Sequence, residues 1–264
     1  MKILVCVKQV LEPEGVIGIS ASGERIEVGP GALFRMNRYD EFAVEEALRI
    51  REKFPGTRID AVSAGPERAA RTVRRALEMG ADQGIHIVLD DERCRTPFEI
   101  ASLIGAYARD RQYDLILAGI MAEDDMQAQV GPMLAEILGY PWATAVMSIR
   151  LPHPSGAVQV ERELEGGRRE AFELTLPALL TVQSGINRPR YPSLSHVLRT
   201  RSQALIQIDA SQASAAAPFS LPAPREWIVN LEEPAPLKTG MILPGSPPEI
   251  AEKLLQILQE RALL

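Results

Sequence analysis

The sequence predicts an α/β fold in which helices cover both faces of a mainly parallel sheet. Continuous apolar runs with β-branched residues, such as Lys2–Lys8 and Tyr113–Ala118, are typical of buried parallel strands. Segments with an apolar helical face, such as Met36–Ile50 and Glu67–Met79, lie between such runs. Alternation of strand and helix along a chain favours a parallel sheet with helices on both sides.

The composition excludes several functional classes. The chain has 264 residues, of which 46% are hydrophobic and 24% are charged, as is normal for a globular protein with one sizeable core. A net charge of -6 argues against a nucleic-acid-binding protein, and 5% aromatic residues argue against a base-stacking platform. Two isolated cysteines, Cys6 and Cys94, and three scattered histidines give no disulfide framework and no metal-ligand pattern.

The N-terminus and the hydropathy pattern bear on localisation. Strand-like residues begin directly after Met1 and Lys2, so we expect no signal or transit peptide. No apolar run approaches the length of a membrane span, and we therefore expect a cytoplasmic protein.

In the first half of the chain, capping residues help to define the elements. Asn37 is a natural N-cap for the helix that follows it, and Asp40 and Glu41 place acids in its first turn. Gly80 is expected to end the next helix, whose arginines we interpret as a solvated face. These arginines are Arg68, Arg71, Arg74 and Arg75. In this half, strands are expected at 2–8, 58–64, 84–89 and 113–118, and helices at 37–50, 67–79 and 96–110.

The regular alternation of strand and helix ends in the second half of the sequence. A helix is expected at 133–138 and a strand at 142–151, and beyond Pro152 two extended segments flank Gly166-Gly167, which is a hairpin signal. A further strand at 177–182 precedes a proline-rich loop and a short helix at about 193–200. Residues 209–224 have the Ala-, Ser- and Pro-rich composition of a linker, and 248–263 form an amphipathic helix. This helix must bury its apolar face on its own domain or on another subunit.

The loop that joins the strand at 113–118 to the next helix is the strongest site candidate. It carries a glycine, acids and glutamines at a strand-to-helix crossing, between Gly119 and Gln129. Ligands of open parallel sheets bind at the carboxyl ends of strands, and helix N-terminal amides there favour an anion such as a phosphate. The G-x-G-x-x-G dinucleotide fingerprint is absent after every strand. An ordinary polar surface crossing is the alternative interpretation.

Six motifs lie in collinear order over residues 1 to about 205: Val7-Lys8-Gln9-Val10, 36–48, 74–82, 129–135, 160–167 leading into Leu176-Pro177-Ala178, and 187–194. Together they resemble the beta subunit of electron-transfer flavoproteins. It implies an adenine nucleotide alpha-hydrolase-like, Rossmann-like domain at 1–205, with a partner-recognition loop at about 184–201. Residues 206–264 would then be a linker and a C-terminal arm that packs on an alpha subunit.

The resemblance also implies cofactors and partners. An alpha subunit would hold most of an FAD shared with this chain, and this chain would bind a structural AMP. The implied nucleotide contacts are the main chain of Cys6 and residues Asn37, Arg38, Tyr39, Asp40, Ala64, Gly119, Ala122, Asp124, Asp125, Gln127, Ala128, Gln129 and Val130. Glu163, Tyr191 and Leu194 would contact partners, although a leucine that starts a helix more often belongs to a core.

The implied function is electron carriage. Electrons would pass from an acyl-CoA or related flavoprotein dehydrogenase to a membrane quinone oxidoreductase, as in fatty acid beta-oxidation. Such a subunit sets the position and surroundings of the flavin and needs no acid–base residue of its own. This expectation agrees with a sequence that shows no catalytic triad, metal cluster or clear nucleophile.

Two positions depart from the AMP-binding members of the family. Val130 stands where those members have threonine, and Ala128 stands where they have asparagine. The run Ala128–Pro132 is more similar to the electron-bifurcating branch, in which the site binds a second FAD and NADH is the donor. The helix at Asn37 is closer to the AMP-binding branch, and we expect AMP. A nucleotide hydrolase or a stress-type adenine-nucleotide-binding protein is a further alternative, but a hydrolase would need a glycine- and serine-rich loop after the first strand.

Overall fold

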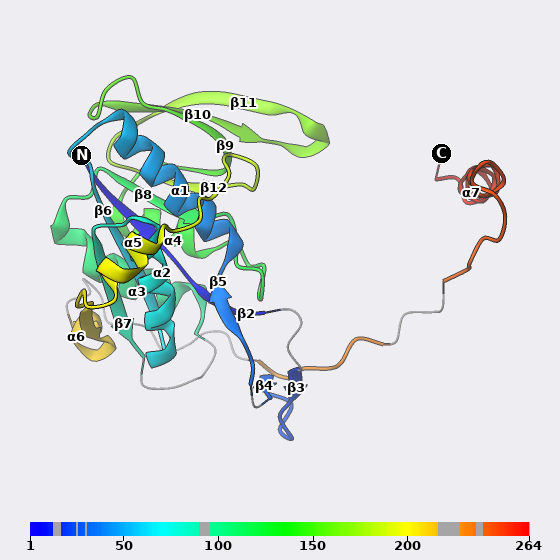
Figure 1. Cartoon of the computed structure of the whole chain (residues 1–264), viewed down its shortest axis with the longest axis horizontal. Coiled ribbons are helices and arrows are strands. Elements are labelled where there is room, and N and C mark those ends of the chain that lie inside the picture. The colour runs from blue at the N-terminus through cyan, green and yellow to red at the C-terminus, as the bar shows by residue number, and fades with distance from the viewer. Residues whose placement is uncertain are drawn as a thin grey trace.

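The computed structural model describes residues 1–12, 17–24, 26–29, 31–89, 95–215, 228–235 and 240–263. In this part of the chain, nine strands form one sheet in the order β11-β10-β9-β12-β8-β1-β6-β7-β13 (Figure 1). Their bounds are β1 Lys2–Cys6, β6 Arg58–Gly65, β7 Gln83–Val88, β8 Leu115–Gly119, β9 Trp142–Arg150, β10 Ala157–Glu163, β11 Arg169–Thr175, β12 Ala178–Val182 and β13 Ile206–Asp209. The predicted α/β fold with a mainly parallel sheet is confirmed. β10 runs in the direction opposite to the other eight strands, which all run the same way.

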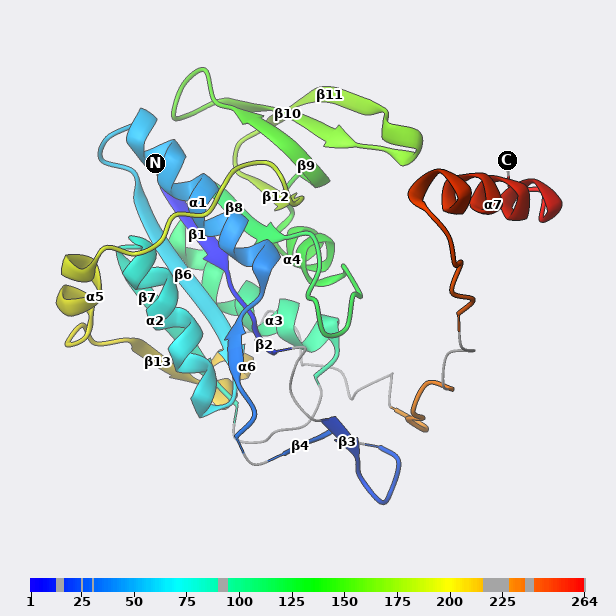
Figure 2. The same cartoon turned by 45° about the vertical axis from the view of Figure 1, so that its right-hand side comes forward.

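Two helical layers cover the sheet. The helices are α1 Arg38–Lys53, α2 Ala70–Met79, α3 Pro97–Ala108, α4 Val130–Leu138, α5 Leu194–Thr200, α6 Ala210–Ala215 and α7 Pro247–Glu260. Short 3-10 turns lie at Glu67–Ala69, Arg109–Arg111 and Glu165–Gly167. One buried cluster joins α1 and α2 to one face of the sheet, and a second joins α3 and α4 to the other. In Figure 2, α1 and α2 lie in front of the sheet.

Alternate residues of the central strands supply the two cores. Ile3 and Val5 of β1 belong to the cluster under α1 and α2, whereas Leu4 and Cys6 belong to the cluster under α3 and α4. This is the period of two that a strand imposes on its side chains. Because both faces are covered, the strand reads as an unbroken apolar run in the sequence.

Local capping explains where the helices begin and end. Thr96 and Glu99 form a capping box at the start of α3, with Pro97 in the first helical position. Gly80 ends α2 with a φ of 133° and Gly139 ends α4 with a φ of 70°, conformations that favour glycine. α4 begins at Val130, three residues before the predicted start of the helix.

The predicted boundary at residue 206 is wrong, because the domain continues beyond it. β13 pairs in parallel with β7 from Ile206 to Asp209, and α6 then packs on α3. The first residues of the predicted linker are therefore helical, and its remaining residues, 216–224, lie outside the described part of the chain, as does Cys94. Two small antiparallel ladders lie outside the main sheet: β2 (Gln9–Leu11) with β5 (Phe34–Met36), and β3 (Ile17–Ile19) with β4 (Ile26–Val28). The sequence at 25–28 predicts one arm of such a hairpin, and β4 confirms it.

The interpretation of the arginines at 68–75 as a solvated face is wrong for two of them, Arg68 in the turn before α2 and Arg74 in α2. Arg68 lies over the ring of Phe34 at 4.0 Å and donates a hydrogen bond to Gln9. Arg74 donates through Nη1 to the main-chain oxygen of Gln203 at 3.1 Å. Arg71, by contrast, is exposed as predicted.

The predicted C-terminal helix is present as α7. It has no buried residue, and Figures 1 and 2 show it apart from the sheet and its helices. The segment that precedes it passes the β3–β4 hairpin, where the Leu231 N–H donates to the Gly23 oxygen at 2.7 Å. The described part of the chain therefore buries no apolar side chain of α7 fully.

Candidate functional site

The candidate site lies where β1 and β8 end beside the first turn of α1. Asp40 of α1 joins the two strand ends: its Oδ2 accepts the Lys8 N–H at 2.7 Å, and its Oδ1 accepts the Gly119 N–H at 3.0 Å. The side chain is buried, and burial raises the pKa of Asp40 to about 7, although the two N–H donors oppose this rise. Asp40 was predicted as a ligand contact, but both of its carboxylate oxygens are used to hold the backbone of the site.

Gly119 permits the close approach of β8 to α1. A Cβ at this position would lie 2.5 Å from Asp40 Oδ1 and 2.5 Å from Tyr39 Cβ. Any side chain would therefore push the strand end away from the first turn of the helix.

Asn37 holds the 120–129 loop, a role that differs from the predicted one. It occupies the N-cap position of α1, but its side chain forms no capping hydrogen bond there. Instead, Asn37 Nδ2 donates to the Met121 oxygen at 2.9 Å, and Oδ1 accepts the Glu123 N–H at 3.1 Å. The amide of asparagine can do both at once because it carries a donor and an acceptor.

Glu123 takes over the capping role from the other side. Its Oε2 accepts the Arg38 N–H at 3.2 Å and pairs with Arg35 Nη2 at 3.0 Å. A carboxylate at this position is favourable because the first-turn amides of α1 are unpaired donors. Glu123 lies in the predicted site loop but was not named as a contact, since the sequence gives no sign that it meets a helix 85 residues earlier.

Lys8 is a second site residue that the sequence did not single out. Its Nζ contacts Asp124 Oδ1 at 2.7 Å and Asp125 Oδ2 at 2.8 Å. Burial alone would lower the pKa of Lys8, but the two carboxylates outweigh this effect and the pKa is raised. Lys8 thus ties the acidic part of the loop to the end of β1.

The start of α4 is the part of the site best suited to an anion. Gln129 occupies the N-cap position of α4 without a side-chain hydrogen bond to the first turn. The loop reaches this point through Met126 and Ala128, which both have positive φ, a conformation uncommon outside glycine. First-turn amides without a side-chain cap favour a phosphate or carboxylate, at about 0.3–1 kcal/mol for each charge.

The remaining predicted nucleotide contacts surround these groups. Cys6 lies at the end of β1, where burial raises the pKa of its thiol, and Ala64 lies near the end of β6. Arg38 and Tyr39 belong to the first turn of α1. The other predicted contacts are in the loop or at its ends: Gly119, Ala122, Asp124, Asp125, Gln127, Ala128, Gln129 and Val130. The structure therefore brings the whole predicted set to the carboxyl edge of the sheet.

The predicted partner contacts lie outside this cluster. Tyr191 and Leu194 follow β12 and are 92% and 73% exposed, so Leu194 is not a core residue. Glu163 ends β10, and its Oε2 accepts from Gln183 Nε2 at 3.3 Å.

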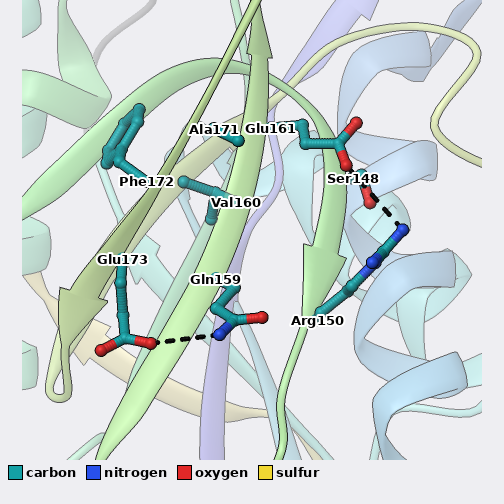
Figure 3. Close-up of a pocket in the computed structure, with 8 residues that line it drawn as sticks. All are labelled: Ser148, Arg150, Gln159, Val160, Glu161, Ala171, Phe172 and Glu173. Atoms are coloured by element: carbon teal, nitrogen blue, oxygen red, sulfur yellow. Dashed lines mark hydrogen bonds and ion pairs between the residues drawn. The ribbon is translucent and has the colours of Figure 1, made fainter.

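A hollow of about 330 Å³ on β9, β10 and β11 is a weaker candidate (Figure 3). Its polar side chains pair with each other: Gln159 Nε2 donates to Glu173 at 3.2 Å, and Arg150 lies 3.8 Å from Glu161. Such pairs leave few groups to orient a ligand, and none of the predicted site residues lines this hollow.

The described residues offer neither a metal-binding cluster nor a membrane-spanning helix. They contain no group of three or more histidine, cysteine, aspartate or glutamate residues arranged to hold a metal ion. Within the same residues, no helix combines the length and the apolar character needed to cross a membrane.

Comparison with known proteins assigns the chain to a family. Residues 31–213 match the electron transfer flavoprotein domain. The chain is 32% identical to the electron transfer flavoprotein subunit beta of Bacillus subtilis over 99% of both chains. It is 33% identical to the Dictyostelium discoideum subunit beta over 100% of this chain and 99% of that one, and 31% identical to that of Bos taurus over 97% and 98%. The chain therefore belongs to the beta subunits of the electron transfer flavoprotein family.

Proposed function

We propose that this chain forms a heterodimer with an electron transfer flavoprotein alpha subunit and binds AMP at the β1–β8 site. The heterodimer carries electrons from flavoprotein dehydrogenases of the acyl-CoA type to a membrane quinone oxidoreductase. FAD, shared between the two subunits, supplies the redox chemistry when bound.

The observation that carries the nucleotide part of the proposal is the start of α4, which has no side-chain cap and follows the loop from Gly119, the strand end held by Asp40. The first-turn amides of α4 have no side-chain cap. The loop that leads to them is held in place by Lys8, Asn37 and Glu123. Backbone amides can bind phosphate without a hydroxyl at position 130, where this chain has valine. The donor set therefore fits a small anionic nucleotide.

The chain's own residues have a positioning role in this mechanism. Asp40 has both oxygens occupied by backbone donors, and Lys8 is neutralised by Asp124 and Asp125. Neither arrangement leaves a free base or nucleophile beside the site, and a nucleotide hydrolase is correspondingly less favoured. A nucleotide here would stabilise the folded subunit instead, because a ligand that binds only the folded state raises its stability.

A second FAD at the same site is the competing assignment. Val130 and Ala128, which favour it in the sequence, lie at the start of α4 and in the loop before it. A second FAD would have to bind beside the 120–129 loop, which the hydrogen bonds of Asn37 and Glu123 hold against α1.

The test is to co-purify the chain with its alpha subunit, denature the complex and quantify the released nucleotides by chromatography. One FAD and one AMP per heterodimer is the expected result. Two FAD and no AMP would reject the AMP site and move the assignment to an electron-bifurcating protein. Failure to form a flavin-containing complex with an alpha subunit would reject the proposed carrier function as a whole.

A further inference from the structure

The segment after Arg190 presents large apolar side chains to solvent. Tyr191, Leu194 and Leu198 are 92%, 73% and 56% exposed, and the segment runs through α5. We call residues 191–200 the docking segment, because the proposed function requires a surface for the partner dehydrogenase and Leu194 is the predicted contact. The inference below concerns what holds this segment and rests on that proposed function.

The beginning of the docking segment is attached to α1 by one arginine. Arg190 Nε and Nη2 donate to the two carboxylate oxygens of Glu45, each at 2.8 Å, and the Arg190 N–H donates to the same carboxylate at 3.0 Å. Arg190 Nη1 also donates to Glu52 at 2.7 Å. Glu45 is buried, with only 4% of its surface exposed. A bidentate pair of this kind fixes direction as well as distance.

Neighbouring contacts strengthen the same attachment. Asn187 Nδ2 donates to the Phe42 oxygen at 3.0 Å and to Glu46 at 2.9 Å. Arg49 Nη1 donates to Glu46 at 3.2 Å and to the Ile186 oxygen at 3.4 Å. One face of α1 therefore holds the loop from 186 to 190.

The end of the docking segment is attached to α2 by a second arginine. Arg74 Nη1 donates to the main-chain oxygens of Gln203 at 3.1 Å and Arg201 at 3.5 Å. Gln203 Nε2 then donates to the Asp82 oxygen at 2.7 Å. α5 packs on α2 between the two attachments, as Figures 1 and 2 show.

We propose that Arg190 and Arg74 are positioning residues that preorganise the docking segment for its partner protein. Both ends of the segment are fixed to rigid helices, while its apolar side chains stay exposed. Ordering a loop before it binds removes an entropic cost from the encounter. Neither arginine is required to touch the partner for this effect.

Hydrogen–deuterium exchange on the intact heterodimer tests the proposal directly. Arg190→Gln combined with Glu45→Gln removes the ion pairs of the first attachment without leaving a buried, unpaired carboxylate, and Arg74→Gln weakens the second attachment. Each of these two variants, the double variant and Arg74→Gln, is expected to exchange the amides of 197–200 about tenfold faster than the wild type. Exchange in β1 and β8 is expected to stay unchanged. Arg71→Gln is the matched control, because Arg71 is exposed on α2 and forms no hydrogen bond or ion pair among the described residues. Unchanged exchange at 197–200 in both test variants would overturn the proposal.

Electron transfer separates this inference from the proposed function. With a flavin-containing acyl-CoA dehydrogenase as donor, the two test variants are expected to raise KM for the heterodimer several-fold at unchanged kcat, and Arg71→Gln to leave both unchanged. Faster exchange without a rise in KM would overturn the claim that the arginines serve docking. If Leu194→Ala also leaves KM unchanged, the docking function itself is wrong, whereas the exchange result still reports on the attachments.

Discussion

At the residue scale, Asp40 shows how a site can depend on a side chain that does not contact the ligand. Its two oxygens accept backbone N–H groups from the ends of β1 and β8, so one carboxylate fixes two strands and the first turn of α1. Removing the acceptor leaves two partly buried donors unsatisfied, and a fully buried one would cost about 1–3 kcal/mol. An aspartate is needed here because both partners are donors.

The raised pKa of Asp40 predicts a pH dependence of stability. Its pKa is about 7 in the folded chain and 3.8 ordinarily, so the folded state holds a proton that the unfolded state has lost between these values. Protonated Asp40 therefore stabilises the folded state fully below pH 3.8. This stabilisation decreases as the pH rises towards 7 and is lost above pH 7. Urea titrations of the wild type and Asp40→Asn at several pH values measure it. The stability difference between the two proteins should shift in favour of the variant as the pH rises from 4 to 7, and a constant difference would contradict the prediction.

At the scale of elements, the loop between β8 and α4 is held by contacts from β1 and α1 as well as by its own turns. Asp124 and Asp125 are adjacent like charges, and the ammonium of Lys8 lies within 2.8 Å of both. Without this cation, the two carboxylates would repel each other and any phosphate that approaches α4. The ion pairs are half exposed, so they matter more for the placement of the loop than for global stability.

Lys8→Met is therefore expected to lower the nucleotide content of the heterodimer with little change in its unfolding midpoint. The remaining charges of Asp124 and Asp125 would disfavour a phosphate, whereas Lys8→Arg keeps the cation and should retain most of the nucleotide. Chromatographic quantification of AMP in each purified complex gives the comparison. Full AMP occupancy in Lys8→Met would show that Lys8 is dispensable for the site.

Some elements could be predicted from the sequence, and others depend on partners that are distant in the chain. β1 and α2 carry their own signals, an unbroken apolar run and a 3.6-residue pattern that ends in glycine. β13 has only four residues and is defined by its pairing with β7. No local sequence pattern predicts this pairing. α6 has the composition of a linker and becomes helical where it packs on α3.

At the scale of the whole molecule, the same limit applies to the site and the docking segment. The site loop could be predicted because a strand-to-helix crossing is a local feature that carries a known geometry. The burial of Glu45 could not be predicted, because a glutamate on a helix is ordinarily exposed and its partner Arg190 lies 145 residues later. Arg74 was interpreted as solvated for the same reason: its acceptor at Gln203 is 129 residues away.

The C-terminal arm leads to the last prediction, which concerns assembly. No residue of α7 is buried, and Leu254 and Leu255 are 47% and 48% exposed, so its apolar face is available to the alpha subunit. Each leucine that becomes buried in a complex contributes about 1.5–3 kcal/mol.

Because β13 and α6 belong to the domain, the informative truncation removes residues 240–264 and keeps everything before them. This truncation is expected to leave the unfolding midpoint of the isolated chain unchanged and to weaken the heterodimer by at least about tenfold. Leu254→Ser with Leu255→Ser should reproduce the loss of affinity, whereas Glu252→Gln on the same helix should not. Affinity for the alpha subunit is measured by titration calorimetry. Undiminished affinity in the truncated chain would exclude α7 from the subunit interface, and a lowered unfolding midpoint would mean that α7 packs on its own domain.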